Sequence, residues 1–143
     1  MLAINCFNKD DSLSFTRLNS RLVSRGPDGT KVIRGENWWL SHNLLSLTGD
    51  FIQQPYLDKE NNIIVVFNGE IYNWNKLVPE SKSEAEAIAK LYDLEGYYFS
   101  RYLDGEFSCL IIDLKYNELI VATDPFGTKP LYYYIDENKA VFS

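Results

Sequence analysis

The sequence predicts an α+β domain in which antiparallel strands are covered by a small number of helices. Short apolar runs rich in Val, Ile, Phe and Tyr recur along the 143 residues, and two stretches between them carry apolar residues at helical spacing. Polar turn residues join several neighbouring runs, as they do in β-hairpins. Runs of strands interrupted by a few helices are typical of α+β folds. The length suits one domain with a sizeable core, so we expect a single domain over residues 1–143.

Eight strands are expected, paired as hairpins where a short polar turn separates two of them. They cover residues 2–7, 30–33, 38–42, 63–67, 107–112, 119–123, 131–135 and 140–142. The first expected helix is capped by Ser12 or Ser14 and runs to about Val23. The second begins at Ser83, where Ser-Glu-Ala-Glu forms a capping box, and ends at Gly96. A short helical turn over residues 98–103 follows, whereas residues 46–56 and 73–82 are expected to be irregular.

Composition and charge exclude several classes of protein. A formal net charge of −6 and a pI near 4.8 argue against binding to nucleic acids or anionic membranes. No apolar run approaches the ~20 residues of a membrane span and no basic-then-apolar leader opens the chain, so we expect a cytoplasmic protein. The single histidine, His42, comes without a Cys-x-x-Cys pair, so neither a metal nor a cofactor is expected. We interpret Cys6 and Cys109 as reduced thiols, with a disulfide as the less favoured alternative.

The stretch that suggests a chemistry is Asn68-Gly69, directly after the apolar run 63–67. Asn-Gly is a strong turn signal because both residues tolerate positive φ, so we expect the strand to end there. The Asn68 side-chain amide and the Gly69 N–H would then be two donors at the end of a rigid strand, where they can hold a developing oxyanion. Taken alone, the pair is more simply explained as an ordinary turn.

Further motifs stand in order along the chain. They are Arg25-Gly26-Pro27-Asp28, His42-Asn43-Leu44-Leu45-Ser46-Leu47, Gln54-Pro55, Ser83-Glu84-Ala85-Glu86, Leu103-Asp104-Gly105-Glu106-Phe107 and the DPFGTKPLYY run at 124–133. Together with the NGEIYN run at 68–73, they resemble the class II glutamine amidotransferase domain, in particular the amino-terminal glutaminase domain of asparagine synthetase. The resemblance covers nearly the whole chain. It implies the four-layer αββα sandwich of antiparallel sheets of amino-terminal nucleophile hydrolases, in a version that is short at its carboxyl end.

The resemblance also implies a chemistry. Chains of this family begin Met-Cys-Gly, and after loss of the methionine the cysteine thiolate attacks the glutamine side-chain amide while the terminal amine moves the proton. The Asn-Gly pair holds the oxyanion, an arginine binds the substrate α-carboxylate, and an aspartate accepts from the substrate α-amino group. The released ammonia passes to a separate synthetase domain.

This sequence departs from the family pattern at three positions. The nucleophile position is Leu2, whose side chain cannot attack, and a bulky residue there is expected to leave the initiating methionine in place. Leu44 stands where the family has the carboxylate-binding arginine, and Glu84, one methylene longer, stands where it has the aspartate. Only the oxyanion positions Asn68 and Gly69 match. Loss of the bidentate arginine contact alone would weaken substrate binding by roughly 2–5 kcal/mol.

Other residues could take over these roles, but their settings favour structural interpretations. Cys6 is the obvious substitute nucleophile, yet its place in the first strand favours a small core residue. His42 is interpreted as a satisfied polar residue at a strand end, in preference to a catalytic base. Glu84 and Glu86 are better explained as acids favoured by a helix amino terminus than as ligands of a substrate.

We therefore predict an asparagine-synthetase-like glutaminase domain that is catalytically degenerate and acts as a binding or scaffolding module. The alternatives are an active glutamine amidotransferase that supplies ammonia to a separate synthetase, and a purely structural fragment. The expected partner is a synthetase-type protein or a second copy of the chain, since a missing edge strand would leave backbone groups unpaired. Glutamine or a related amino acid is expected to bind weakly at most, in a vestigial pocket formed by Leu44, Asn68, Gly69 and Glu84.

Overall fold

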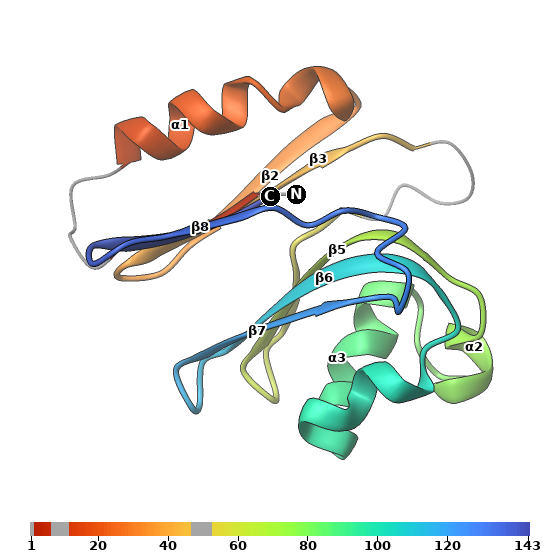
Figure 1. Ribbon diagram of the computed structural model, residues 1–143. Helices are drawn as coiled ribbons and strands as arrows, with labels where there is room; N and C mark the ends of the chain where they lie inside the picture. The colour runs from red at the N-terminus through yellow and green to blue at the C-terminus, as the bar shows by residue number, and fades with distance from the viewer. Residues whose placement is uncertain (1, 7–11, 47–52) are drawn as a thin grey trace. The chain divides into compact units, whose positions relative to one another are not determined.

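A computed structural model describes residues 2–6, 12–46 and 53–143, and these form two compact units. Unit 1 contains the described residues up to Pro55 together with Tyr132–Ser143, and unit 2 is Tyr56–Leu131. Each unit has its own antiparallel sheet and its own helices, and each is described by itself (Figure 1). The predicted α+β class with antiparallel sheets and few helices is confirmed. The prediction of one domain over residues 1–143 stays a prediction.

Unit 1 is built on a five-stranded sheet with the strand order β2-β3-β1-β9-β8, in which all neighbours are antiparallel. Its strands are β1 (Leu2–Cys6), β2 (Gly29–Arg34), β3 (Trp38–Leu44), β8 (Tyr133–Ile135) and β9 (Lys139–Phe142). The expected β2–β3 and β8–β9 hairpins are confirmed. Strand β1 lies between them and joins the two hairpins into one sheet, so the start of the chain is held at the sheet centre.

Helix α1 (Ser12–Ser20) runs along one face of this sheet and is followed by the short 3-10 helix η1 (Val23–Arg25) (Figure 1). The ring of Phe15 stacks on Trp39 of β3, with the ring centroids 6.3 Å apart. The expected continuous helix to Val23 is wrong, because the chain switches to bonds between residues three apart after Ser20: the Arg21 N–H bonds the Leu18 carbonyl and the Leu22 N–H bonds that of Asn19.

A buried polar cluster also fixes α1 on the sheet. The Asn19 side-chain oxygen accepts a hydrogen bond from Ser41 Oγ at 2.8 Å and another from Asn43 Nδ2 at 2.9 Å. The Asn43 oxygen in turn accepts from Thr30 Oγ1 at 2.7 Å. Because the amides and hydroxyls of this cluster bond to one another, the cluster stabilises one register of the helix against β2 and β3.

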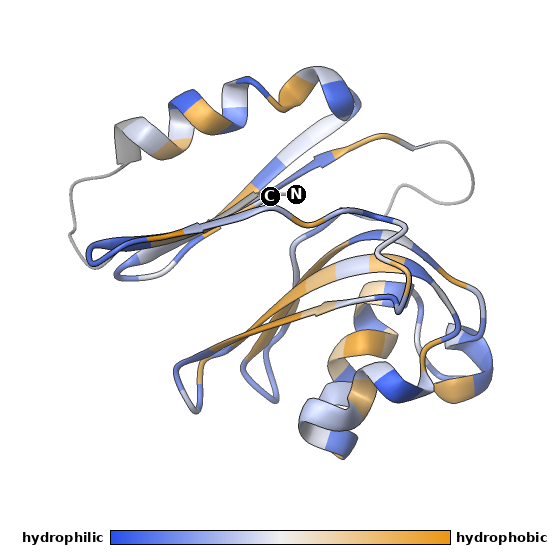
Figure 2. Ribbon diagram, viewed as in Figure 1, coloured by the Kyte–Doolittle hydropathy of each residue, from blue (hydrophilic) through white to orange (hydrophobic). Residues whose placement is uncertain are grey.

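Unit 2 has a four-stranded antiparallel sheet with the strand order β4-β5-β6-β7. Its elements are β4 (Tyr56–Asp58), β5 (Ile63–Ile71), α2 (Trp74–Leu77), α3 (Glu84–Glu95), the 3-10 helix η2 (Gly96–Tyr102), β6 (Gly105–Asp113) and β7 (Glu118–Thr123). Figure 2 shows that the central strands of this sheet are mainly apolar. Since β5 and β6 pair over nine residues, they form the rigid centre of the unit.

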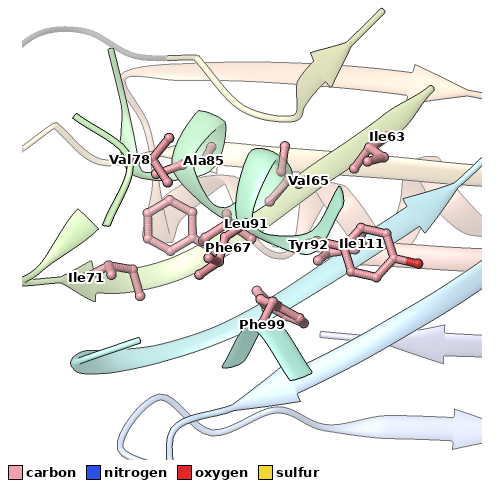
Figure 3. Close-up of a cluster of buried hydrophobic side chains, with 14 of the residues drawn as sticks. Ile63, Val65, Phe67, Ile71, Val78, Ala85, Leu91, Tyr92, Phe99 and Ile111 are labelled. Atoms are coloured by element: carbon pink, nitrogen blue, oxygen red, sulfur yellow. The ribbon is translucent and has the colours of Figure 1, made fainter. Parts of the chain in front are cut away.

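The core of unit 2 lies between this sheet and α3 (Figure 3). Alternate residues of β5 face the helix, so Ile63, Val65, Phe67 and Ile71 point into one cluster. Their partners from the helices and β6 include Ala85, Ile88, Leu91, Tyr92, Phe99, Cys109 and Ile111. The alternation of β5 leaves the intervening residues 64, 66 and 68 on the opposite face of the sheet.

The two ends of α3 confirm the sequence signals for that helix. Ser83 Oγ accepts from the Glu86 N–H at 3.2 Å, as a capping box requires, and Gly96 ends the helix with φ of +58°. The return bond of the box is displaced by one residue, because Glu86 Oε2 accepts from the Lys82 N–H at 2.9 Å. Helix α2 and the first residue of β4 fall where irregular chain was expected, and β4 itself was not predicted.

Candidate functional site

The Asn68-Gly69 pair lies inside a strand, so the expected turn is wrong. Strand β5 continues to Ile71, with Asn68 paired to Ser108 and Gly69 to Phe107. Gly69 has φ of +133°, and a Cβ there would collide with the carbonyl oxygen of Glu106. Gly69 therefore permits a close approach between two paired strands, whereas the sequence analysis expected it to end the strand.

The register of the sheet decides where the Gly69 N–H points. The N–H and C=O of its partner Phe107 are both bonded to Asp124, the first to Oδ2 at 3.1 Å and the second by the Asp124 N–H at 2.9 Å. Gly69 and Phe107 are therefore a pair without mutual hydrogen bonds, and the Gly69 N–H is directed away from β6. On that side, β4 pairs with β5 only as far as Val65 among the described strands.

Beside this N–H, the Asn68 side chain is exposed and lies on the sheet face opposite α3. Its cross-strand neighbour Ser108 is 1% exposed, and the Ser108 hydroxyl has no hydrogen-bond partner within the described chain. Thr123 of β7 completes the same row. The Asn68 amide is thus exposed and the Gly69 N–H is directed away from β6, and Ser108 is a polar neighbour that the sequence analysis missed. Its only sequence signal is a hydroxyl in an apolar strand.

The Glu84 side chain is brought to the end of the same strand. Its Oε1 accepts a hydrogen bond from the Ile71 N–H at 2.7 Å. Burial raises the pKa of Glu84, the Ile71 N–H opposes that shift, and the nearby carboxylate of Glu70 adds to it. Asn68, Gly69 and Glu84 therefore gather around the last residues of β5, all within unit 2. The Glu84 carboxylate therefore holds the backbone at the end of β5 in place, in addition to any role in binding.

The loop after β7 is organised by a single buried carboxylate, that of Asp124. It accepts from the N–H groups of Phe107 at 3.1 Å, Phe126 at 2.9 Å and Thr128 at 3.0 Å, and from Thr128 Oγ1 at 3.1 Å. Burial alone would raise the pKa of Asp124, but the N–H groups of Thr128, Phe126 and Phe107 lower it overall. A salt bridge from Lys129 to Glu106, 2.9 Å long, ties the loop to β6.

The other two site positions, Leu2 and Leu44, belong to unit 1. The backbone of Leu2 pairs with Ser41, so β1 begins beside the middle of β3. Leu44 is the last residue of β3, is half-buried, and its carbonyl accepts from the Asp28 N–H at 3.0 Å. A Cβ on Gly26 would collide with the Asn43 carbonyl. The loop around Gly26 and Asp28 therefore packs closely on the backbone at the end of β3.

Two candidate catalytic groups have environments that suppress their reactivity. His42 lies inside β3, not at a strand end, and its buried Nδ1 has no hydrogen-bond partner in the described chain, so the interpretation as a satisfied residue is wrong. Burial lowers the pKa of His42 to about 4. Cys109 is fully buried in the unit 2 core as a free thiol, and burial raises its pKa to about 12. At neutral pH, both groups are uncharged.

Across the chain segments that are described, His, Cys, Asp and Glu side chains form no group of three suited to a metal ion. In the same segments, no helix combines the length and the apolar character that crossing a bilayer requires.

Comparison with known proteins gives one consistent result. The glutamine amidotransferase domain family matches the chain over residues 1–143. A probable glutamine-hydrolyzing asparagine synthetase of Dictyostelium discoideum is 35% identical over 126 residues, which covers 80% of this chain and 23% of that protein. Glutamine-hydrolyzing asparagine synthetase 1 of Lotus japonicus is 34% identical over 143 residues, covering 92% of this chain and 24% of that protein. The chain thus spans about a quarter of the length of these relatives.

A solved structure agrees at the level of the fold. Glutamine phosphoribosylpyrophosphate amidotransferase from B. subtilis, complexed with ADP and GMP, has a TM-score of 0.75 at 20% sequence identity. The match covers 99% of this chain and 40% of that chain. The predicted similarity to the fold of amino-terminal nucleophile amidotransferases is confirmed.

Proposed function

Because the chain belongs to the glutamine amidotransferase domain family and is asparagine-synthetase-like, we propose that it is a catalytically degenerate member kept as a binding or scaffolding module. The observation that carries the proposal is the presence of leucine at two positions, Leu2 and Leu44, where the family places its nucleophile and its carboxylate anchor. Neither side chain has a donor, an acceptor or a charge. The framework around them, in contrast, keeps the family motifs.

The remaining thiols do not readily replace the nucleophile. Cys109 lies in the apolar core of unit 2, and a thiol with a pKa of about 12 supplies almost no thiolate at neutral pH. Cys6 is the last residue of β1, where its backbone pairs with Lys139 of β9. Covalent catalysis at carbon needs a thiolate beside its substrate, so loss of the cysteine at position 2 removes the main route.

The remaining polar groups suit weak binding of an amide. The exposed Asn68 amide and the outward Gly69 N–H can both donate to a carbonyl or carboxylate oxygen. Without an arginine at position 44, no fixed charge from that position faces a substrate carboxylate. We therefore expect glutamine or a related amino acid to bind weakly at most, and the unit 2 positions proposed to contact it are Asn68, Gly69 and Glu84.

The decisive experiment measures ammonia release from L-glutamine by the purified protein beside a Leu2→Cys, Leu44→Arg double variant. We expect no release above background from the native chain, because both the nucleophile and the anchor are absent. Intact-mass analysis of each protein establishes which residue is amino-terminal. Release by the double variant alone would assign the loss of activity to these two positions.

Binding is tested separately by NMR titration of the ¹⁵N-labelled protein with L-glutamine. Shifts at the Gly69 amide and the Asn68 side chain that saturate only at high ligand concentration are expected. Asn68→Ala is the variant that should abolish them, and Asn61→Ala, at a surface turn that bonds Asp58, is the control. If shifts appear elsewhere and not at these two residues, the proposed pocket is wrong.

The competing function is an active amidotransferase that supplies ammonia to a separate synthetase. The observation in its favour is the preserved donor pair at Asn68 and Gly69, which an inactive chain does not need for catalysis. Ammonia release by the native protein would establish it, and Cys6→Ser would then identify the nucleophile. The proposed protein partner of the inactive module is a synthetase-type protein, and the proposed location is the cytoplasm.

A further inference from the structure

Strand β8 forms one edge of the unit 1 sheet, and only its β9 side is occupied by a described strand. Its three residues are all large and largely exposed: Tyr133 at 72%, Tyr134 at 56% and Ile135 at 60%. The preceding Tyr132 is 71% exposed. An exposed edge of this composition can pair with another strand.

The hydrogen bonds to β9 show which backbone groups are left for such pairing. Tyr132 and Ser143 exchange both bonds, at 2.7 and 2.8 Å, and the Asp136 N–H bonds the Lys139 carbonyl at 2.9 Å. Even-numbered residues therefore face β9. The N–H and C=O groups of Tyr133 and Ile135 consequently point away from β9, so the outer edge presents two donors and two acceptors.

Natural edge strands are often protected by being very short, by a lysine or a proline, or by a bulge. Strand β8 is short, at three residues. The segment 131–135 reads Leu-Tyr-Tyr-Tyr-Ile and contains neither lysine nor proline. Pro130 stands before the strand and Asp136 after it, so both lie outside the three residues whose edge is open. The charged residue that would repel a neighbouring strand, Asp136, therefore lies beyond the end of β8 and not within it.

We propose that β8 pairs antiparallel with β8 of a second copy of this chain, about a two-fold axis at Tyr134. In this register Tyr133 lies opposite Ile135 of the second copy and exchanges both backbone bonds with it, twice by symmetry. Each such pair places an aromatic ring against a β-branched side chain, a favourable cross-strand combination. The two five-stranded sheets of unit 1 would become one continuous sheet.

The pattern of charge suits pairing of β8 with its own copy and disfavours registers shifted towards Asp136. With the axis at Tyr134, each Asp136 lies opposite Tyr132 of the other copy, and the two carboxylates are separated by roughly 13 Å along the strands. A shift of two residues that pairs Ile135 with itself would move both Asp136 and Glu137 inward, against Tyr134 and Tyr133. With the axis at Tyr134 all three strand residues of the two copies overlap, and no carboxylate lies between them.

The proposal is tested by sedimentation equilibrium of the full chain over a roughly hundredfold range of concentration, reaching the high micromolar range expected for a small interface. The expected result is a reversible monomer–dimer equilibrium. Tyr133→Pro removes an outward N–H that β9 does not use, so it should weaken dimerisation roughly tenfold or more while the fold persists. Tyr133→Thr, which keeps the N–H and favours strands, is the matched control and should retain dimerisation.

Amide exchange locates the interface and covers the case in which the proline variant does not fold. The Tyr133 and Ile135 amides should become slower to exchange as protein concentration rises, whereas the Tyr134 amide, already bonded to β9, should not change. A strictly monomeric protein at the highest concentration would refute the proposal. So would a dimer in which these two amides keep a concentration-independent exchange rate, because its contact would lie elsewhere.

Discussion

Gly69 carries two constraints at once, a positive φ and a carbonyl oxygen in the space of a Cβ. Gly69→Ala should lower the free energy of unfolding by about 3 kcal/mol, since backbone strain and overpacking add. Gly96→Ala is the matched control, because Gly96 also has positive φ but has nothing within 4 Å of its Cβ position. Gly96→Ala should cost roughly 1–2 kcal/mol, because its φ of 58° and ψ of −138° strain a residue with a Cβ although no neighbouring atom is displaced. Urea unfolding followed by circular dichroism compares the two, and equal losses would contradict a role for the close approach to β6.

His42 should make stability depend on pH. Its pKa is about 4 in the folded protein and 6.5 in the unfolded chain, so between these values the unfolded chain binds a proton that the folded one does not. Stability contributed by the neutral imidazole is therefore full above pH 6.5 and is lost as the pH falls towards 4, by roughly 3 kcal/mol in total. His42→Gln does not titrate in this range. Urea unfolding at several pH values should show a shallower acid loss for that variant, and parallel curves would contradict the assignment.

For single residues of the candidate site, the sequence allowed only a partial prediction. Asn68 and Gly69 were recognisable as donors. The Asn-Gly sequence, however, is equally compatible with a turn and with a close approach between paired strands. Distant residues decide between the two, since the Asp124 carboxylate and N–H occupy both backbone groups of Phe107 and leave the Gly69 N–H directed away from β6. The unpartnered Ser108 hydroxyl depends on packing and has no local signature.

Two serines at the amino end of α3 differ in their hydrogen bonding, so their effects on stability can be compared. Ser83→Ala removes the cap that accepts from the Glu86 N–H and should lower stability by about 1 kcal/mol. Ser81→Ala, two residues earlier, deletes a buried hydroxyl without a hydrogen-bond partner in the described chain, so it should be neutral or slightly stabilising. Thermal unfolding of both variants measures the difference. A similar loss for both would mean that volume, not capping, is responsible.

The same element explains what could be predicted about secondary structure. Helix α3 was predictable because its start and end are both marked by local residues, Ser83 and Gly96. Strand β4 was not, since it has only three residues and its Asp58 bonds the Glu60 and Asn61 N–H groups in the turn that follows. The turn signal is local, whereas the strand exists through its pairing with β5.

For the whole molecule, the unequal cores of the two units predict unequal resistance to opening. In unit 2, the amides of β5 and β6 lie in strands whose residues are mostly buried, while β8 in unit 1 is exposed throughout. Hydrogen exchange at low protein concentration should therefore be slowest in β5 and β6 and fastest in β8. Peptide-resolved mass spectrometry measures this order. Uniform protection across both units would contradict it and indicate a single cooperative opening.

The overall fold class was predictable because several motifs occur in the same order along the chain as in the family, although each motif alone is weak evidence. The division into two compact units was not, since no linker or change of composition marks the boundaries near Pro55 and Leu131. The chain crosses from one unit to the other twice, so sequence neighbours at these points belong to different sheets. Only the long-range pairing of β9 with β1 reveals that membership.

The buried free thiol of Cys109 has a practical consequence. A soluble alkylating reagent can reach that sulfur only when β6 and its neighbours separate, so its rate of labelling reports how often unit 2 opens. In a Cys6→Ser background, Cys109 would be the sole cysteine. The rate at which Cys109 is alkylated would then report opening of unit 2 under native conditions, and mass spectrometry could follow it without an attached dye.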